Sequence, residues 1–339
     1  MGYDNFKNKI CSRYNSYVNT KNKVRLFKSA LDKLALEELP NRDNDSFFQV
    51  RDFTNTNNID INFIYKNIMC YYSEERKALV VGVIAPDWRN GWRNISKDKF
   101  VSEQIDFIMH FISQYIYRSY QINLIGAIAL AKCTSTDFRG VTLENLKGFS
   151  LSNRIKEFKD TIQKHDSKKY LDIIGYLKLI NALDPFVNKA IFYYIKFLEL
   201  DNLGYTEEAL TAADNMIDVI FQFIKRHKKL VTMDRKKMST IVYDEIGLFD
   251  TDIKNSIERL YMLRCQFTAH PARLKWWDFY EIYEYELEQI QLSVRRTLVL
   301  FLKYECNNRC IDAYPTIWSE WFVKYCDIIY DAVDFHDLP

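Results

Sequence analysis

The sequence predicts a mainly α-helical protein in which a C-terminal antiparallel helix bundle follows a mostly helical N-terminal region. Only nine glycines and six prolines occur among 339 residues, so we expect long helices with few sharp turns. Apolar residues make up 48% of the chain and aromatic residues 15%, which is enough for a large core. In the second half, apolar residues recur at the spacing of helices that bury one face. The N-terminal region is expected to contain at most a small strand element.

Two regions are expected along the chain. Residues 1–150 would form a regulatory or sensing region, and residues 151–339 a helical domain with its core at about 185–305. The boundary is placed at the amphipathic, charged segment near residue 150.

The C-terminal helices are predicted from apolar periodicity and from the breaks between periodic segments. Short connections between long helices favour antiparallel neighbours. The predicted helices cover residues 170–183, 186–200, 206–227, 233–247, 250–270, 278–303 and 316–333.

The N-terminal region has weaker signals. Residues 3–38 have an apolar helical face and end before Pro40, and residues 101–133 form a long apolar helix or a pair of helices. The run 77–85 is short, rich in β-branched residues and stopped by Pro86, so it is the clearest strand candidate. The most apolar stretch, 122–131, covers half a membrane span and is therefore expected to be a core helix.

Charge and cysteine usage limit the class of protein. Lys plus Arg number 47 against 45 for Asp plus Glu, so a nucleic-acid surface would have to be a local patch. Seven scattered cysteines and no apolar leader in residues 1–20 predict reduced thiols in a cytoplasmic protein. No metal site or cofactor is expected, since Cys306 and Cys310 have no second pair or histidine near them in the sequence.

One short run combines residues that a buried helix does not need. An apolar stripe that includes Ile257 and Leu260 leads to Arg264, and His270 follows six positions later. Pro271 comes next, and a residue before proline avoids the α region, so His270 should lie at the end of the helix. Arg273 and Lys275 then lead to two tryptophans and the next helix.

This arrangement resembles the HEPN superfamily, whose signature is an arginine, four to six residues and a histidine at a helix end. The lead-in from Leu260 to Arg264 is similar to that of the family, whereas Cys265 stands where the family often has a small polar residue. The resemblance covers residues 185–305.

The resemblance implies a metal-independent endoribonuclease that cleaves RNA by attack of a ribose 2′-hydroxyl. His270 would then act as acid and base and Arg264 would stabilise the phosphate, while Arg273 and Lys275 hold the RNA backbone. It also implies a homodimer with a composite active site, no membrane association, and a role as a toxin or as an abortive-infection effector in anti-phage defence. An antitoxin or a sensor would be a further partner, and Tyr261 is a conceivable site of silencing modification.

Other interpretations remain open at this point. Arg264 would pair with Glu258 or Asp278, and His270 would bond to carbonyls of the last helical turn, if both had structural roles only. The domain would then be an inactive HEPN-like module for nucleotide binding or dimerisation, or a helical interaction scaffold. The chain has none of the phosphate-loop, dinucleotide-binding, zinc-protease or nucleophile-elbow motifs that mark several other enzyme classes.

A second candidate RNA-binding segment lies at residues 87–99. Arg89 and Arg93 alternate there with Trp88 and Trp92, and such alternation suits base stacking and phosphate contact. The alternative is a loop whose tryptophans pack on the core while its arginines reach water.

Overall fold

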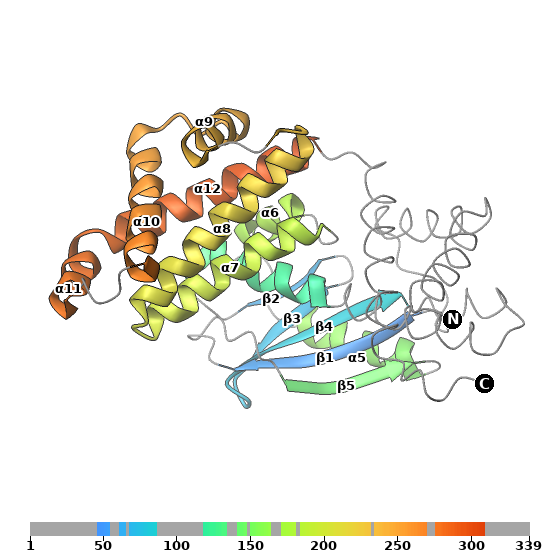
Figure 1. The fold of residues 1–339 in the computed structure, drawn as a ribbon. Coiled ribbons are helices and arrows are strands. Elements are labelled where there is room, and N and C mark those ends of the chain that lie inside the picture. Colours follow the sequence, from blue (N-terminus) through green and yellow to red (C-terminus); the bar gives the residue numbers. More distant parts are fainter. Residues whose placement is uncertain are drawn as a thin grey trace, which may run out of the picture. The chain divides into compact units, whose positions relative to one another are not determined.

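The computed structural model describes residues 46–54, 61–65, 68–86, 118–133, 141–147, 150–163, 171–180, 184–231, 234–269 and 275–308. These residues are mostly helical, as predicted, and include a sheet (Figure 1). The chain divides into two compact units, one of residues 48–85 and 115–308 and one of residues 1–47, 86–114 and 309–339. The predicted helices 3–38 and 316–333 lie outside the described residues, and the predicted boundary at residue 150 stays a prediction.

The sheet has five strands in the order β2-β3-β4-β1-β5. The strands are β1 (Ser46–Thr54), β2 (Asn62–Tyr65), β3 (Ile68–Ser73), β4 (Ala78–Pro86) and β5 (Val141–Lys147). β3 pairs antiparallel with both β2 and β4, in the registers Asn62↔Tyr71 and Ile68↔Val83. β4 is the central strand and its residues 78–84 are all buried, which explains its continuous apolar run.

The strand predicted at 77–85 matches β4. The prediction of at most a small strand element underestimated the number of strands, since β4 belongs to a five-stranded sheet. β2 and β3 are short, and residues on both of their faces are buried, among them Phe63, Met69 and Cys70. Such strands lack the alternation of apolar and polar residues that identifies a half-exposed strand. β2 and β3 therefore gave no clear periodic signal.

Two helices of the described residues contact the sheet. α5 (Ser150–Gln163) contacts β2 and β3, with Phe158 packed edge-on against Tyr71 at 5.2 Å between ring centroids. A helix at 118–132 is buried along residues 123–130 and receives a hydrogen bond from Arg51 of β1 to Gln121 at 3.1 Å. The stretch 122–131, predicted as a core helix, lies within this helix.

Gly126 lies where the helix at 118–132 meets α7 (Pro185–Asn202). A Cβ at this position would overlap Cγ2 of Ile191, which is fully buried. We expect Gly126→Ala to lower the free energy of unfolding by about 0.5–2 kcal/mol, because the overlap outweighs the gain in helix propensity. The urea midpoint measures it.

Gly175 in α6 (Leu171–Leu179) is the matched control, since a Cβ there would meet nothing within 4 Å. Gly175→Ala should stabilise the protein by about 0.5–1 kcal/mol. Equal effects of the two substitutions would contradict the close approach of the two helices.

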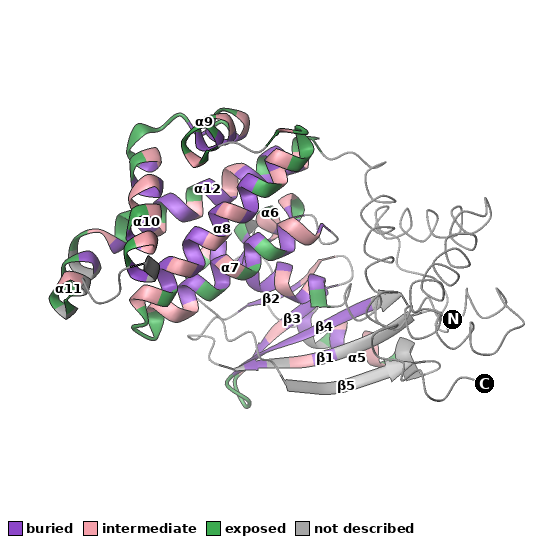
Figure 2. Ribbon diagram, in the orientation of Figure 1, coloured by how far each residue is buried: buried purple, intermediate pink, exposed green. Residues whose placement is uncertain are grey.

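Seven further helices follow the sheet in the described part of the chain. They are α6, α7, α8 (Thr206–His227), α9 (Arg235–Ile246), α10 (Thr251–Ala269), α11 (Trp276–Tyr285) and α12 (Leu287–Asn308). α7 and α8 are joined by a three-residue turn and lie side by side, and α12 contacts all of the other six (Figure 1). Their apolar faces supply most of the buried side chains in this part of the chain (Figure 2).

The predicted helix 278–303 is divided by the structure into α11 and α12. The division falls at Glu286, which ends α11 with φ −114° and ψ −31°. Its carboxylate accepts two hydrogen bonds from Arg259 of α10, at 2.7 and 2.9 Å. No glycine or proline marks this break, so the sequence did not predict it.

The Arg259–Glu286 pair gives a pH-dependent prediction. Hydrogen bonding to Arg259 lowers the pKa of Glu286, so the pair stabilises the protein above the ordinary range of a glutamate and loses this effect as the pH falls through the lowered pKa. Glu286→Gln should reduce the free energy of unfolding by about 0.5–1 kcal/mol at neutral pH. In acid the two proteins should converge.

Urea unfolding at neutral and acidic pH tests this, with Glu288→Gln, an exposed neighbour, as the control. A difference between wild type and Glu286→Gln that does not change with pH would contradict the ion-pair account.

Within the described residues, no helix has the length and apolarity needed to cross a membrane.

Candidate functional site

Arg264 lies on α10, whose start and buried face follow from its sequence. The side chain of Asp250 accepts hydrogen bonds from the backbone N–H groups of Asp252 and Ile253 and so caps the first turn. Leu260, Leu263 and Phe267 are buried on the face that packs against α8 and α12. Arg264 follows Leu263 at the edge of this face, and 32% of its side chain is exposed.

The other predicted site residues fall mostly outside the described chain. The described part of α10 ends at Ala269, one residue before His270, so the expected helix end at His270 stays a prediction. His270 itself, Arg273, Arg89 and Arg93 lie outside the described residues. Their predicted roles, catalysis for His270 and RNA contact for the three arginines, therefore stay predictions.

Lys275 is described and begins the segment that follows the site. Its backbone N–H donates to Asp278 at 2.7 Å, and its Nζ lies 5.0 Å from the ring centroid of Trp277. Trp277 and Tyr280 on α11 are 54% and 55% exposed. The described part of α11 thus presents aromatic surface next to one cation.

The carboxylate that Arg264 contacts is Asp214 of α8. Nε of Arg264 lies 3.5 Å from Oδ2 of Asp214, and the Asp214 side chain is fully buried. The predicted structural partners have other contacts, since Glu258 accepts a hydrogen bond from Tyr243 at 3.4 Å and Asp278 accepts one from the Lys275 backbone. A buried carboxylate behind a partly exposed guanidinium can fix the orientation of that guanidinium.

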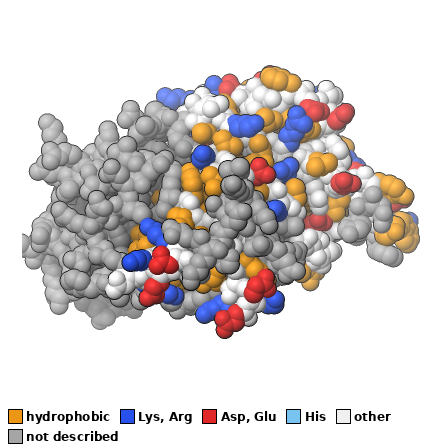
Figure 3. Space-filling view, turned by 180° about the vertical axis from the view of Figure 1, so that it is seen from behind, with side chains coloured by type: hydrophobic (Ala, Val, Ile, Leu, Met, Phe, Trp, Pro, Cys, Tyr) orange, Lys and Arg blue, Asp and Glu red, His pale blue; other side chains and the backbone are white. Residues whose placement is uncertain are grey.

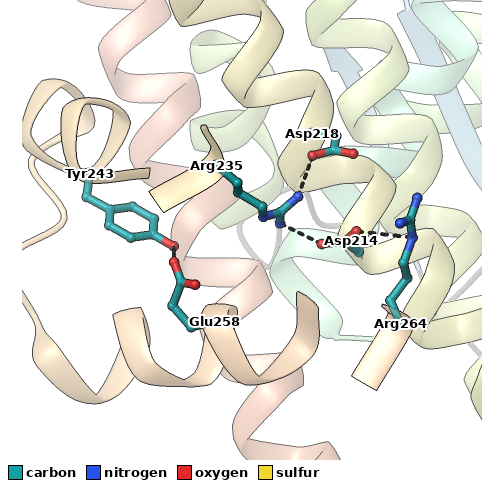
Figure 4. Close-up of polar contacts among 6 residues, drawn as sticks. All are labelled: Asp214, Asp218, Arg235, Tyr243, Glu258 and Arg264. Carbon is teal, nitrogen blue, oxygen red and sulfur yellow. Dashed lines mark hydrogen bonds and ion pairs between the residues drawn. The ribbon is translucent and has the colours of Figure 1, made fainter. Parts of the chain in front are cut away.

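A second arginine shares Asp214. Arg235, the first residue of α9, donates from Nη2 to Asp214 and from Nη1 to Asp218, both at 2.7 Å (Figure 4). Its guanidinium carbon lies 3.8 Å from the ring centroid of Tyr261, which precedes Arg264 by one helical turn. We call Asp214, Asp218, Arg235, Tyr261 and Arg264 the arginine–aspartate cluster.

The buried carboxylate is the electrostatic centre of this cluster. Burial raises the pKa of Asp214, and Asp218 acts in the same direction, whereas Arg235 and Arg264 oppose the shift. Because an arginine stays charged at any physiological pH, two guanidinium groups face this carboxylate and we treat it as ionised at neutral pH.

Comparison with known proteins finds no matching family, no matching curated protein and no matching solved structure. The geometry of the described residues therefore has to support any functional proposal. Among these residues, no group of three or more His, Cys, Asp or Glu side chains is arranged to hold a metal ion.

Asp214 and Arg235 were not predicted as site residues. Asp214 carried one signal in the sequence, because it is a charged residue among the apolar positions Leu210, Ala213 and Ile217 of its helix. Arg235 carried none, since only the packing of α9 on α8 brings it to Asp214.

The surface around these helices carries both signs of charge. On the face seen in Figure 3, basic and acidic side chains of the described residues are interspersed rather than gathered by sign. Contact with a polyanion would therefore depend on a few placed cations, as the near-zero net charge predicts.

Proposed function

We propose that the chain is a metal-independent endoribonuclease with a HEPN-like C-terminal helix bundle. The observation that supports this is the position of Arg264. Its side chain is partly exposed, faces a buried carboxylate, and belongs to α10, whose described part stops one residue before His270. An oriented guanidinium beside a histidine is the pair that cleavage through the 2′-hydroxyl requires.

The proposed reaction breaks one phosphorus–oxygen bond and forms another. His270 takes the proton of the 2′-hydroxyl, the 2′-oxygen attacks phosphorus, and the 5′-oxygen leaves with a proton supplied by a histidine. Arg264 donates hydrogen bonds to the non-bridging oxygens, on which negative charge grows in the transition state. The products carry a 2′,3′-cyclic phosphate and a 5′-hydroxyl.

Substrate binding in this proposal uses the segment after the motif. Lys275 and the predicted contact Arg273 would hold phosphates there, and the exposed rings of Trp277 and Tyr280 would stack on bases. Arg89 and Arg93 are proposed separately, as RNA contacts of the segment 87–99. Stacking on exposed rings is tolerant of sequence, so the preferred substrate is single-stranded RNA.

The cellular role proposed is that of a cytoplasmic toxin or abortive-infection effector in anti-phage defence, controlled by an antitoxin or by a sensing region in residues 1–150. We expect a homodimer in which two Arg264–His270 pairs form one composite site. Sedimentation at micromolar concentration should give twice the chain mass of 40.5 kDa. A strict monomer, with and without RNA, would contradict the composite site.

The decisive test is incubation of the purified protein with a mixed RNA pool in excess EDTA. EDTA stops metal-dependent nucleases, whereas attack assisted by side chains continues. We expect cleavage of RNA and no cleavage of DNA of the same sequence, because DNA lacks the 2′-hydroxyl. Loss of cleavage in EDTA, or equal cleavage of DNA, would refute the proposal.

One observation favours a second candidate, an inactive HEPN-like nucleotide-binding or dimerisation module. Arg264 contacts a buried carboxylate, as an arginine with a purely structural role also does. This alternative predicts nucleotide binding or dimerisation without cleavage of any RNA in the pool.

A further inference from the structure

Two arginines contact one buried carboxylate, and they contact it unequally. Oδ1 of Asp214 accepts a hydrogen bond from Nη2 of Arg235 at 2.7 Å, whereas Oδ2 lies 3.5 Å from Nε of Arg264 (Figure 4). The first distance is that of a strong charge-assisted hydrogen bond, and the second is that of a looser ion pair.

Arg235 is held in place from several sides. Besides Asp214 it binds Asp218 at 2.7 Å, and its guanidinium lies 3.8 Å from the ring centroid of Tyr261 and 5.3 Å from that of Phe221. Only 18% of its side chain is exposed, compared with 32% for Arg264. Arg235 is therefore the fixed cation of the pair, and Arg264 is the more accessible one.

A buried carboxylate limits how far the cations paired with it can move away. Removing the last cation from a buried charge is strongly unfavourable, because the charge has lost its hydration and has no replacement for it. If Asp214 had only Arg264 beside it, any movement of Arg264 toward a phosphate would leave this charge alone in the core. With Arg235 in place, Asp214 keeps one short charge-assisted hydrogen bond, from Nη2 of Arg235 at 2.7 Å, when Arg264 moves away.

We propose that Arg235 is a positioning residue that neutralises Asp214 and so leaves Arg264 able to bind the reacting phosphate. This inference rests on the proposed ribonuclease function. Arg235 acts through Arg264 and does not touch RNA. Without Arg235, Asp214 draws Arg264 into the closer contact, and the transition state loses its guanidinium.

The test is a double-mutant cycle on kcat for RNA cleavage, with Arg235→Gln and Arg264→Ala separately and together. Arg235→Gln should lower kcat by about tenfold to hundredfold in the wild-type background. In a background that carries both Arg264→Ala and Asp214→Asn, so that no buried charge is left without a cation, it should have no further effect, because the group through which it acts is gone. Asp214→Asn, added to Arg235→Gln, should restore part of kcat since the competing charge is removed.

Loss of folding is separated from this effect by two measurements. All variants are assayed below their thermal unfolding transitions, and Arg259→Gln, which removes another ion pair from α10, should change kcat by no more than about twofold. A general weakening of α10 would lower kcat in the background that carries Arg264→Ala and Asp214→Asn as well, and that result would overturn the proposal.

Failure of this proposal and failure of the ribonuclease function give different results. A wild type that cleaves RNA, together with an Arg235→Gln variant of equal kcat, would refute the role of Arg235 and leave the ribonuclease standing. A wild type that cleaves no RNA would refute both.

Discussion

Arg264→Ala is expected to lower kcat for RNA cleavage by about a hundredfold to a thousandfold, as removal of an oxyanion-hole donor does in other enzymes. The guanidinium would donate to phosphate oxygens whose charge grows during attack, so its loss falls on the transition state more than on binding. KM should therefore change less than kcat. Initial rates on one defined RNA give both constants.

Arg264→Lys is the variant that distinguishes charge from geometry. Lysine restores a positive charge but not the planar group of N–H donors, so only partial recovery is expected. Full recovery with lysine would show that Arg264 acts as a point charge, and wild-type rates in Arg264→Ala would remove it from the site. Circular dichroism of both variants checks that the helical content is kept.

His270→Ala is expected to abolish detectable cleavage, because both proton transfers in the proposed reaction use this histidine. A histidine titrates near neutral pH and can therefore accept and return a proton within one turnover. The rate constant under single-turnover conditions is the direct measurement, since it excludes effects on product release.

His227→Ala is the matched control for this substitution. His227 is the last residue of α8, and its Nδ1 lies 3.0 Å from the hydroxyl of Tyr304. It lies thirteen residues beyond Asp214 on the same helix, about 20 Å along the axis. Its loss should leave cleavage within about twofold of wild type. Equal cleavage by His270→Ala and His227→Ala would contradict the assignment of His270.

The sequence predicted those parts of the fold whose signals are local. α8 was expected at 206–227 and occupies Thr206–His227, because its apolar face, acidic start and basic end all agree. α10 and β4 were predicted for similar reasons, one from its apolar stripe and one from its β-branched run.

The parts that were missed depend on tertiary contacts. β2 and β3 lack alternation because residues on both of their faces are buried, and the end of α11 depends on an arginine from a different helix. The same holds for the candidate site, where the sequence predicted Arg264 but not its partner Asp214. Asp214 and Arg235 meet Arg264 only through the packing of α8, α9 and α10.

The central claim is that this chain cleaves RNA by attack of the adjacent 2′-hydroxyl, with Arg264 at the phosphate. The most direct measurement is the mass of the 3′ end of the products formed from a defined RNA in EDTA by wild type and by Arg264→Ala. We expect wild type to leave a 2′,3′-cyclic phosphate, and Arg264→Ala to leave the same end far more slowly. Products with a 3′-hydroxyl, or equal rates from the two proteins, would contradict the claim.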